Sequence, residues 1–215
     1  MLGLPSTVAV CRVIPKNAFY RNLKMTSALR DAFTHDVEKI EMAASIKEAT
    51  CGIPADEHVA EVVVLALDVR ERTVPRDVVA AIIRGIPNKV LVACRHEGEV
   101  ALALVRQQLQ VGTWQPEGDV RLALRGATLD DVWDALSEQV IFADGAAAVE
   151  PASSSEAAPS LTIDERIERE RRIEALRRDV ATITRKHDKE KQIAKRNALF
   201  RQLKAAKRDL AELEN

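Results

Sequence analysis

The stretch HVAEVVVLALDVRE, residues 58–71, decides the fold class of this sequence. Between Val62 and Val69 every residue except Asp68 is apolar, and valine is the commonest. An apolar run that is rich in β-branched residues and too short for a typical helix is characteristic of a strand buried on both faces. We therefore expect a central sheet with helices packed on it.

Four other segments carry helix signals, each with Pro or Thr near its start. They are IPKNAFYRNL (14–23), TSALRDAFT (26–34), TVPRDVVAAIIRGIP (73–87) and TLDDVWDALSEQVIF (128–142). Thr26, Thr73 and Thr128 are candidate N-caps, because a hydroxyl oxygen can accept a hydrogen bond from a free N–H of the first turn. Asp131 follows Thr128 by three residues, which is the spacing of a capping box.

Further strands are predicted in DVEKIEMAA (36–44), NKVLVACRHEGEVALALVRQ (88–107) and PEGDVRLALRG (116–126). The second of these segments contains Glu97-Gly98, a dipeptide that predicts a hairpin turn between two strands. The helix predicted before it has the length of a crossover between strands near residues 65 and 91. The expected fold class is α+β, with a mostly antiparallel sheet and packed helices.

A composition change then divides the chain. ADGAAAVEPASSSEAAPS, residues 143–160, consists mainly of Ala, Ser and Pro and cannot bury enough apolar surface to offset its ordering entropy. We expect a globular domain at 1–142, a flexible linker at 143–160, and a charged helical tail at 161–215.

Apolar residues recur in the tail at steps of three and four, as in a coiled-coil seam. They are Ile163, Ile167, Ile173, Leu176, Val180 and Ile183, then Leu199, Leu203, Ala206, Leu210 and Leu213. The two halves are out of register, because continuing the first half forward puts His187, Glu190 and Asn197 on the seam. A helical hairpin that turns near 187–190 gives each half its own seam and is favoured. A single long helix that pairs as a coiled coil in a homo-oligomer is the alternative.

The stretch between the two seams is strongly basic. From Arg185 to Arg208 there are ten Lys or Arg and two acidic residues. Contacts with phosphates need this charge density, and an acidic protein surface would satisfy the same charges. The candidate contact residues are Arg185, Lys186, Lys189, Lys191, Lys195, Arg196, Arg201 and Lys204, together with Trp114 in the turn-rich segment VGTWQPEG (111–118). A solvated helix face, a protein contact and a DNA or RNA contact are all compatible with this pattern.

Motifs for catalysis are not found in the sequence. It contains no G-x-x-x-x-G-K-[ST] phosphate loop, no G-x-G-x-x-G and no G-x-S-x-G. The four histidines and three cysteines are scattered, so no metal site, cofactor or disulfide framework is predicted. Cys94 lies in the apolar stretch VLVAC and is expected to be a buried thiol rather than a nucleophile. A nuclease-like enzyme is a second alternative, although carboxylates such as Asp36, Glu38 and Asp68 lack the Glu-x-Lys pattern of such sites.

The net charge of −1 is unevenly distributed. Residues 161–215 carry 16 Lys/Arg and 11 Asp/Glu, whereas residues 1–142 carry 16 and 19. A basic tail on an acidic body indicates an interaction tail. The sequence has no long apolar run and no secretory signal at its start, and its cysteines form no disulfide pattern, so we expect a cytoplasmic protein that does not contact membranes.

Several stretches resemble a family of prokaryotic proteins classed only as a domain of unknown function. They are MLGLP (1–5), IPKNAFY (14–20), VAEVVVLALDV (59–69), IIRGIPNKVLVAC (82–94) and KEKQIAKRNALFRQLKAAKRDLAEL (189–213). Members of this family are similar in plan, with an α+β body and a charged C-terminal helical segment. The resemblance implies a gene beside helicase and DNA-methyltransferase genes in restriction-like or phage-defence loci, and it supplies no catalytic residues.

The predicted function is therefore a non-catalytic accessory subunit, or adaptor, of a DNA-processing system. By the family resemblance, its partner is a helicase or a DNA methyltransferase, bound through the body and the coiled-coil tail. Non-specific nucleic-acid binding by the basic tail is the first alternative, and an enzyme is less favoured than either form of binding protein.

Overall fold

The computed structural model describes residues 2–142 and 162–214 of the chain. The chain divides into two compact units, Met1–Ser153 and Ser154–Asn215, and each has its own internal packing. The predicted flexible linker, 143–160, lies outside the described residues.

The first unit is built on a seven-stranded sheet in the order β1-β2-β3-β4-β5-β6, with β7 also paired to β5. The strands are β1 (Ala9–Val13), β2 (Val37–Ile46), β3 (Val62–Val69), β4 (Lys89–His96), β5 (Glu99–Arg106), β6 (Gln108–Val111) and β7 (Gln115–Pro116). Among the described strands, β3 and β4 form a parallel pair and the other pairings are antiparallel. The predicted α+β class with a mostly antiparallel sheet is confirmed.

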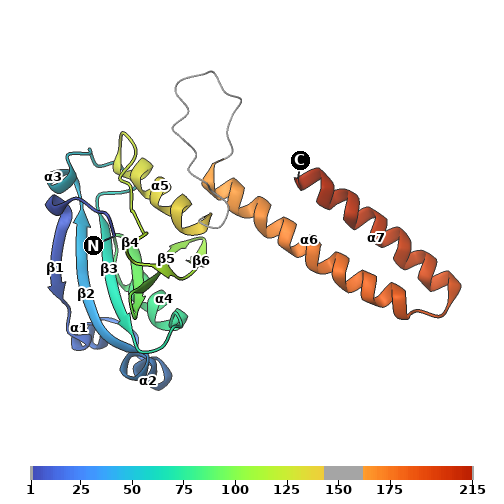
Figure 1. Ribbon diagram of the computed structural model, residues 1–215, viewed down its shortest axis with the longest axis horizontal. Coiled ribbons are helices and arrows are strands. Elements are labelled where there is room, and N and C mark those ends of the chain that lie inside the picture. The colour runs from blue at the N-terminus through green and yellow to red at the C-terminus, as the bar shows by residue number, and fades with distance from the viewer. Residues whose placement is uncertain (1, 143–161, 215) are drawn as a thin grey trace. The chain divides into compact units, whose positions relative to one another are not determined.

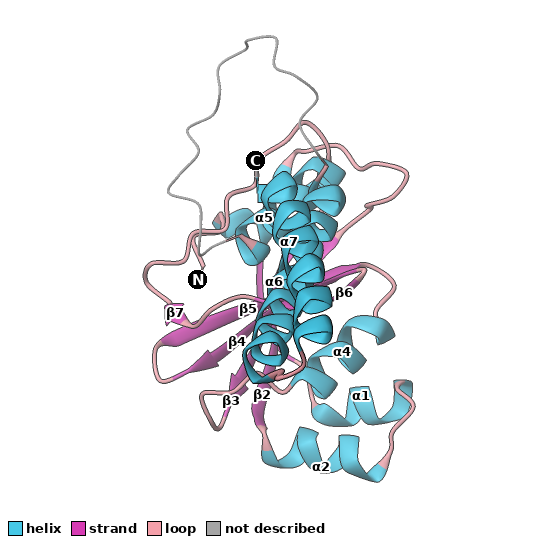
Figure 2. Ribbon diagram, turned by 90° about the vertical axis from the view of Figure 1, so that its right-hand side faces the viewer, coloured by secondary structure: helices cyan, strands magenta, loops and turns pink. Residues whose placement is uncertain are grey.

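Helices cover both faces of this sheet (Figures 1 and 2). They are α1 (Lys16–Asn22), α2 (Ser27–His35), α3 (Glu48–Cys51), α4 (Arg76–Gly85) and α5 (Leu129–Ile141), with a short 3-10 turn η1 (Ser6–Val8) near the start of the chain. Helix α4 makes the predicted crossover between β3 and β4.

Strand β3 is the centre of the core. Every one of its residues except Asp68 is buried, as its apolar composition predicts. Val62 and Val64 pack with α5 on one face of the sheet, and Val63 and Leu65 pack with α1, α2 and α4 on the other. The alternation of strand side chains thus divides one apolar run between two cores.

The turn between β4 and β5 also follows from the sequence. Glu97 and Gly98 both have positive φ, at 45° and 83°. Two consecutive residues with positive φ match the twist of the adjoining strands in a two-residue hairpin, and glycine adopts this conformation without strain. The predicted hairpin at Glu97-Gly98 is confirmed.

Helix α5 begins with the predicted capping box. Thr128 Oγ1 accepts a hydrogen bond from the N–H of Asp131 at 3.3 Å, and Asp131 Oδ2 accepts one from the N–H of Thr128 at 3.0 Å. The carboxylate also accepts from the N–H of Ala127 at 2.9 Å. Hydrogen bonds from these backbone groups favour the charged carboxylate, and they lower the pKa of Asp131.

Loss of this cap has a measurable cost. We expect Thr128→Ala to lower the free energy of unfolding by about 1 kcal/mol, because N–H groups of the first turn lose their acceptor. Urea unfolding followed by tryptophan fluorescence measures it, since both tryptophans lie in the first unit. Thr128→Ser keeps the hydroxyl and should unfold within a few tenths of a kcal/mol of the wild type. An unchanged urea midpoint for Thr128→Ala would contradict the capping role.

The structure of this unit differs from the sequence expectations at several places. Strands β1 and β6 were not predicted, because both are short and lie at the two ends of the strand order, where one strand neighbour is enough. The strand predicted within 116–126 is wrong beyond Pro116. Val120 and Leu122 are buried there, and the N–H of Leu122 donates to the carbonyl of Leu2 at 2.8 Å. The alternating pattern therefore reflects packing beside the N-terminal segment rather than a strand of the sheet.

The predicted cap of α4 is also wrong. The helix starts at Arg76 with Pro75, rather than Thr73, at the N-cap position. A proline is readily accommodated at a helix start because its missing N–H has no helical acceptor there, so Pro75 sets the boundary two residues later than the Thr73 hydroxyl suggests.

The second unit is a pair of antiparallel helices, α6 (Ile163–Lys189) and α7 (Ile193–Glu214) (Figure 1). A capping box of Thr162 and Glu165 starts α6. Near the open end of the pair, Arg169 Nε donates to the carbonyl oxygen of Leu213 at 2.8 Å. The helical hairpin is therefore the form that the tail takes in this structure, and its turn at 190–192 begins at the end of the predicted turn region near 187–190.

The register break of the apolar pattern explains the turn. The seam residues of both helices are half-buried: Ile173, Leu176, Val180 and Ile183 on α6, and Leu199, Leu203, Ala206, Leu210 and Leu213 on α7. Because the helix is interrupted at 190–192, neither seam has to continue through the polar positions between them. Each half buries its own apolar stripe against the other.

Candidate functional site

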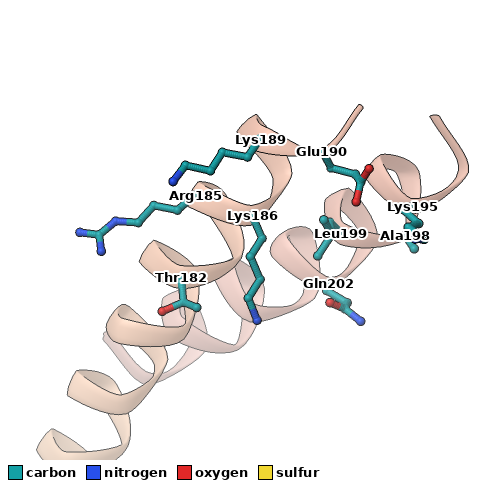
Figure 3. A pocket seen from close by; sticks show the side chains of 9 residues that line it. All are labelled: Thr182, Arg185, Lys186, Lys189, Glu190, Lys195, Ala198, Leu199 and Gln202. Atoms are coloured by element: carbon teal, nitrogen blue, oxygen red, sulfur yellow. The ribbon is translucent and has the colours of Figure 1, made fainter. Parts of the chain in front are cut away.

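A groove of about 660 Å³ lies where α6 ends and α7 begins (Figure 3). We call it the tip groove, and it is lined by Thr182, Arg185, Lys186, Lys189, Glu190, Lys195, Ala198, Leu199 and Gln202. Both helices contribute because the short turn places the last turns of α6 beside the first turns of α7. Figure 3 shows Lys186 and Leu199 between the two helices, while Arg185 extends outward.

The tip groove is strongly cationic. Arg185, Lys186, Lys189 and Lys195 line it, and all four are exposed. Within residues 2–142 and 162–214, none of the four forms an ion pair with another residue of the chain. The acidic lining residue, Glu190, is used locally, because its Oε1 accepts the backbone N–H of Gln192 at 2.9 Å.

The two helix ends at the groove differ electrostatically. Lys186 and Lys189 lie in the last turn of α6, where the negative end of the helix dipole stabilises cations. Helix α7 has no acidic residue in its first turn, where an acidic residue would be stabilising. Lys195 instead adds positive charge to the positive end of that helix, so a bound anion would be favourable there.

This arrangement suits carboxylate or phosphate groups. Lysine ammonium groups donate charge-assisted hydrogen bonds to either, and the arginine guanidinium binds such groups in a bidentate manner. Ala198 and Leu199 add apolar surface to the groove.

The structure brings together some of the predicted contact residues and separates others. Arg185, Lys186, Lys189 and Lys195 share the tip groove. Lys191 lies in the turn, and Arg196, Arg201 and Lys204 are exposed on α7 outside the groove. The neutral lining residues Thr182, Ala198, Leu199 and Gln202 were not predicted, because only the pairing of the two helices brings them to one place. The exposed side chain of Phe200, also on α7, was not among the predicted contacts.

Trp114 belongs to the first unit and is half-buried against the core on the α4 side of the sheet. The Arg72 guanidinium lies 5.8 Å from the centre of its ring, a cation–π distance. Arg72 also forms an ion pair with Glu99. Trp114 therefore has contacts of its own within the unit, and its predicted contact role stays a prediction.

A second cleft, of about 410 Å³, lies at the carboxyl ends of the parallel strands β3 and β4 and includes Asp68 and Arg95. Ligands of open α/β sheets often bind at such ends. Here Arg95 Nε pairs with Asp68 Oδ1 at 2.7 Å, and Arg95 Nη2 lies 3.8 Å from Glu41 Oε2. Lys39 Nζ is 2.6 Å from the same Glu41 oxygen. Asp68 and Glu41 are thus each paired with a cation of a neighbouring residue in the sheet.

Metal-ligating side chains are not clustered in the described part of the chain. Across residues 2–142 and 162–214, no three His, Cys, Asp or Glu residues lie together in a way that could hold a metal ion.

The cysteines differ in environment. Cys94 is fully buried in β4, and burial raises the pKa of its thiol to about 12. The predicted buried thiol is confirmed. Cys11 is exposed on β1, and Cys51 is intermediate.

We expect the difference in burial between Cys11 and Cys94 to determine which thiol is alkylated in the native protein. Iodoacetamide at about pH 8 should modify Cys11 in the native protein, whereas Cys94 should react only after denaturation, because the thiolate is the nucleophile. Peptide mass spectrometry after native and denatured labelling measures both sites. Native modification of Cys94 at the rate of Cys11 would contradict the buried assignment.

Together, the fold and the site define an α+β sheet protein that carries a basic helical hairpin. The chain belongs to the family described as Domain of unknown function (DUF4391), whose family model matches residues 2–210. No curated protein and no solved structure matches the chain. In the described residues, no helix has both the length and the apolar character that crossing a membrane requires.

Proposed function

We propose that this protein is a non-catalytic accessory subunit that binds an acidic surface of a partner protein with the tip groove of its hairpin. One observation carries the proposal. The groove holds four cations that are exposed and that form no ion pair in the described part of the chain: Arg185, Lys186, Lys189 and Lys195. Cations that form no ion pair among the described residues are available to an anionic partner.

The mixture of apolar and charged residues in the tip groove supports a protein partner. A protein interface combines an apolar centre with a polar rim. Here Ala198 and Leu199 provide the apolar part, while Lys186, Lys189 and Lys195 provide the charge. Rim charges of this kind steer the encounter of two proteins and accelerate their association.

The class of partner rests on the family resemblance rather than on geometry. A helicase or DNA methyltransferase of a restriction-like or phage-defence system is the proposed partner, and the sheet unit provides a second contact with it. Such a partner works in the cytoplasm, where we place this protein too.

Affinity purification of the full-length protein from its native cells tests this proposal. We expect a helicase or a DNA methyltransferase to be enriched, and to be released by high salt, because charge contacts are screened by ions. Enrichment of neither class, or retention that high salt does not affect, would contradict it.

A further inference from the structure

A second surface of the hairpin combines cations with an exposed aromatic ring. Arg196, Phe200 and Lys204 follow one another at steps of four on α7, so their side chains lie along one face of the helix. We call this set the aromatic stripe. Each of its members is exposed, and Phe200 is 56% exposed.

The aromatic stripe is distinct from the tip groove. Its first two residues directly follow the groove residues Lys195 and Leu199 in the sequence. One residue along an α-helix turns by about 100°, so the two sets point in different directions from α7. The groove and the stripe can therefore be occupied at the same time.

The ring of Phe200 has an internal neighbour that still leaves it accessible. The imidazole of His187, at the end of α6, lies 6.2 Å from it between ring centres, at an interplanar angle of 44°. An aromatic ring that contacts a neighbouring ring but remains largely exposed to solvent is suited to stacking against a flat group.

The charge along α7 points to a polyanion. From Lys191 in the turn to Lys207 on α7 the sequence holds six Lys or Arg and no Asp or Glu, whereas Arg208 is paired with Asp209 and Glu212. Long cationic side chains one turn before and one turn after an exposed ring reproduce the pattern by which proteins bind single strands, in which bases stack on aromatics and phosphates contact cations.

We propose that the aromatic stripe binds single-stranded nucleic acid, with a base stacked on Phe200 and neighbouring phosphates on Arg196 and Lys204. A duplex hides its base faces within the stack and offers nothing for Phe200 to contact. An acidic protein is the other occupant that would satisfy the cations and cover the ring, and the comparison with poly-glutamate distinguishes it from a single strand. The binding is independent of sequence, because every base has a face that can stack.

Fluorescence anisotropy of the full-length protein with a labelled single-stranded oligothymidine tests the proposal. We expect Phe200→Ala to weaken binding on the order of tenfold while the slope of log Kd against log salt stays the same, because stacking releases no counterions. Arg196→Gln and Lys204→Gln should each reduce the magnitude of that slope by about 0.7, the value for one single-strand phosphate contact. Phe200→Trp, which keeps an aromatic face, should retain binding.

The matched comparisons are the same oligonucleotide as a duplex and poly-glutamate as a polyanion without bases. Stronger binding of the single strand than of either, together with sensitivity to Phe200→Ala, supports the proposal. No binding of the single strand overturns it. Equal binding of poly-glutamate that is unaffected by Phe200→Ala also overturns it, and identifies the stripe as a second acidic-protein contact. Replacing Lys186 and Lys189 by Glu distinguishes the aromatic stripe from the tip groove. These changes should weaken capture of the partner protein more than binding of the oligonucleotide.

Discussion

Replacing Lys186, Lys189 and Lys195 together by Glu is expected to weaken binding of the co-purified partner by about a hundredfold or more. The triple variant removes three tip-groove cations that form no ion pair within residues 2–142 and 162–214, and it places like charges against an acidic surface. Placing like charges against one another at an interface costs several kcal/mol, and a change of this size exceeds what the loss of a surface ion pair produces. The dissociation constant of the variant, measured by biolayer interferometry, gives the effect directly.

A control of equal charge change shows whether position matters. Arg172, Arg178 and Lys207 are exposed on the hairpin outside the tip groove, and reversing them alters the net charge by the same amount. This control should bind the partner within about threefold of the wild type, because it leaves the tip groove intact and long-range effects are screened by salt. Equal losses in the two variants would indicate a general charge effect and would contradict a role for the groove.

The largest expected effect on stability is that of Leu91→Ala, which should lower the free energy of unfolding of the sheet unit by about 2–5 kcal/mol. Leu91 is fully buried in β4. It is paired with Val64 on β3 and with Leu104 on β5, in the core that α5 covers. Truncation leaves a cavity between three central strands, whose backbones are fixed by the sheet and cannot close it.

Urea unfolding followed by tryptophan fluorescence measures this loss, because Trp114 and Trp133 both report on the first unit. Leu91→Met conserves volume and should cost less than about 1.5 kcal/mol. If Leu91→Ala unfolds at the same urea concentration as Leu91→Met, the central position of β4 is wrong.

The structure of the first unit could be predicted wherever residues close together in the sequence determine it. Val62–Val69 identified the central strand, Glu97-Gly98 the hairpin and Thr128 with Asp131 the start of α5. Each of these features depends on residues that are neighbours in the sequence.

The incorrect predictions for the first unit have a different origin. Strand β1 carries no long apolar run, and it exists because β2 offers it a partner. The segment with Val120 and Leu122 alternates like a strand but packs beside the N-terminal segment, so burial rather than pairing determines its pattern. Pairing and burial both depend on residues distant in the sequence, which a local pattern does not contain.

The sequence predicted the positive charge of the candidate site but not which residues share a surface. The basic run identified the cations, and the register break between the two seams identified a turn near them. Which cations share a surface depends on the rotation of α6 and α7 against each other. Lys189 and Lys195 therefore lie in one groove, while Arg196, only one residue further along, faces elsewhere.

The role of the tip groove is tested most directly by measuring the Kd of the full-length protein for its co-purified partner as a function of salt. We predict that affinity falls steeply between about 50 and 300 mM NaCl for the wild type, because the contacts are between exposed charges. For the variant with Glu at 186, 189 and 195, we predict weak binding at every salt concentration. A wild-type Kd that does not change with salt, or a variant that follows the wild-type curve, would contradict the assignment of the tip groove as the partner-binding site.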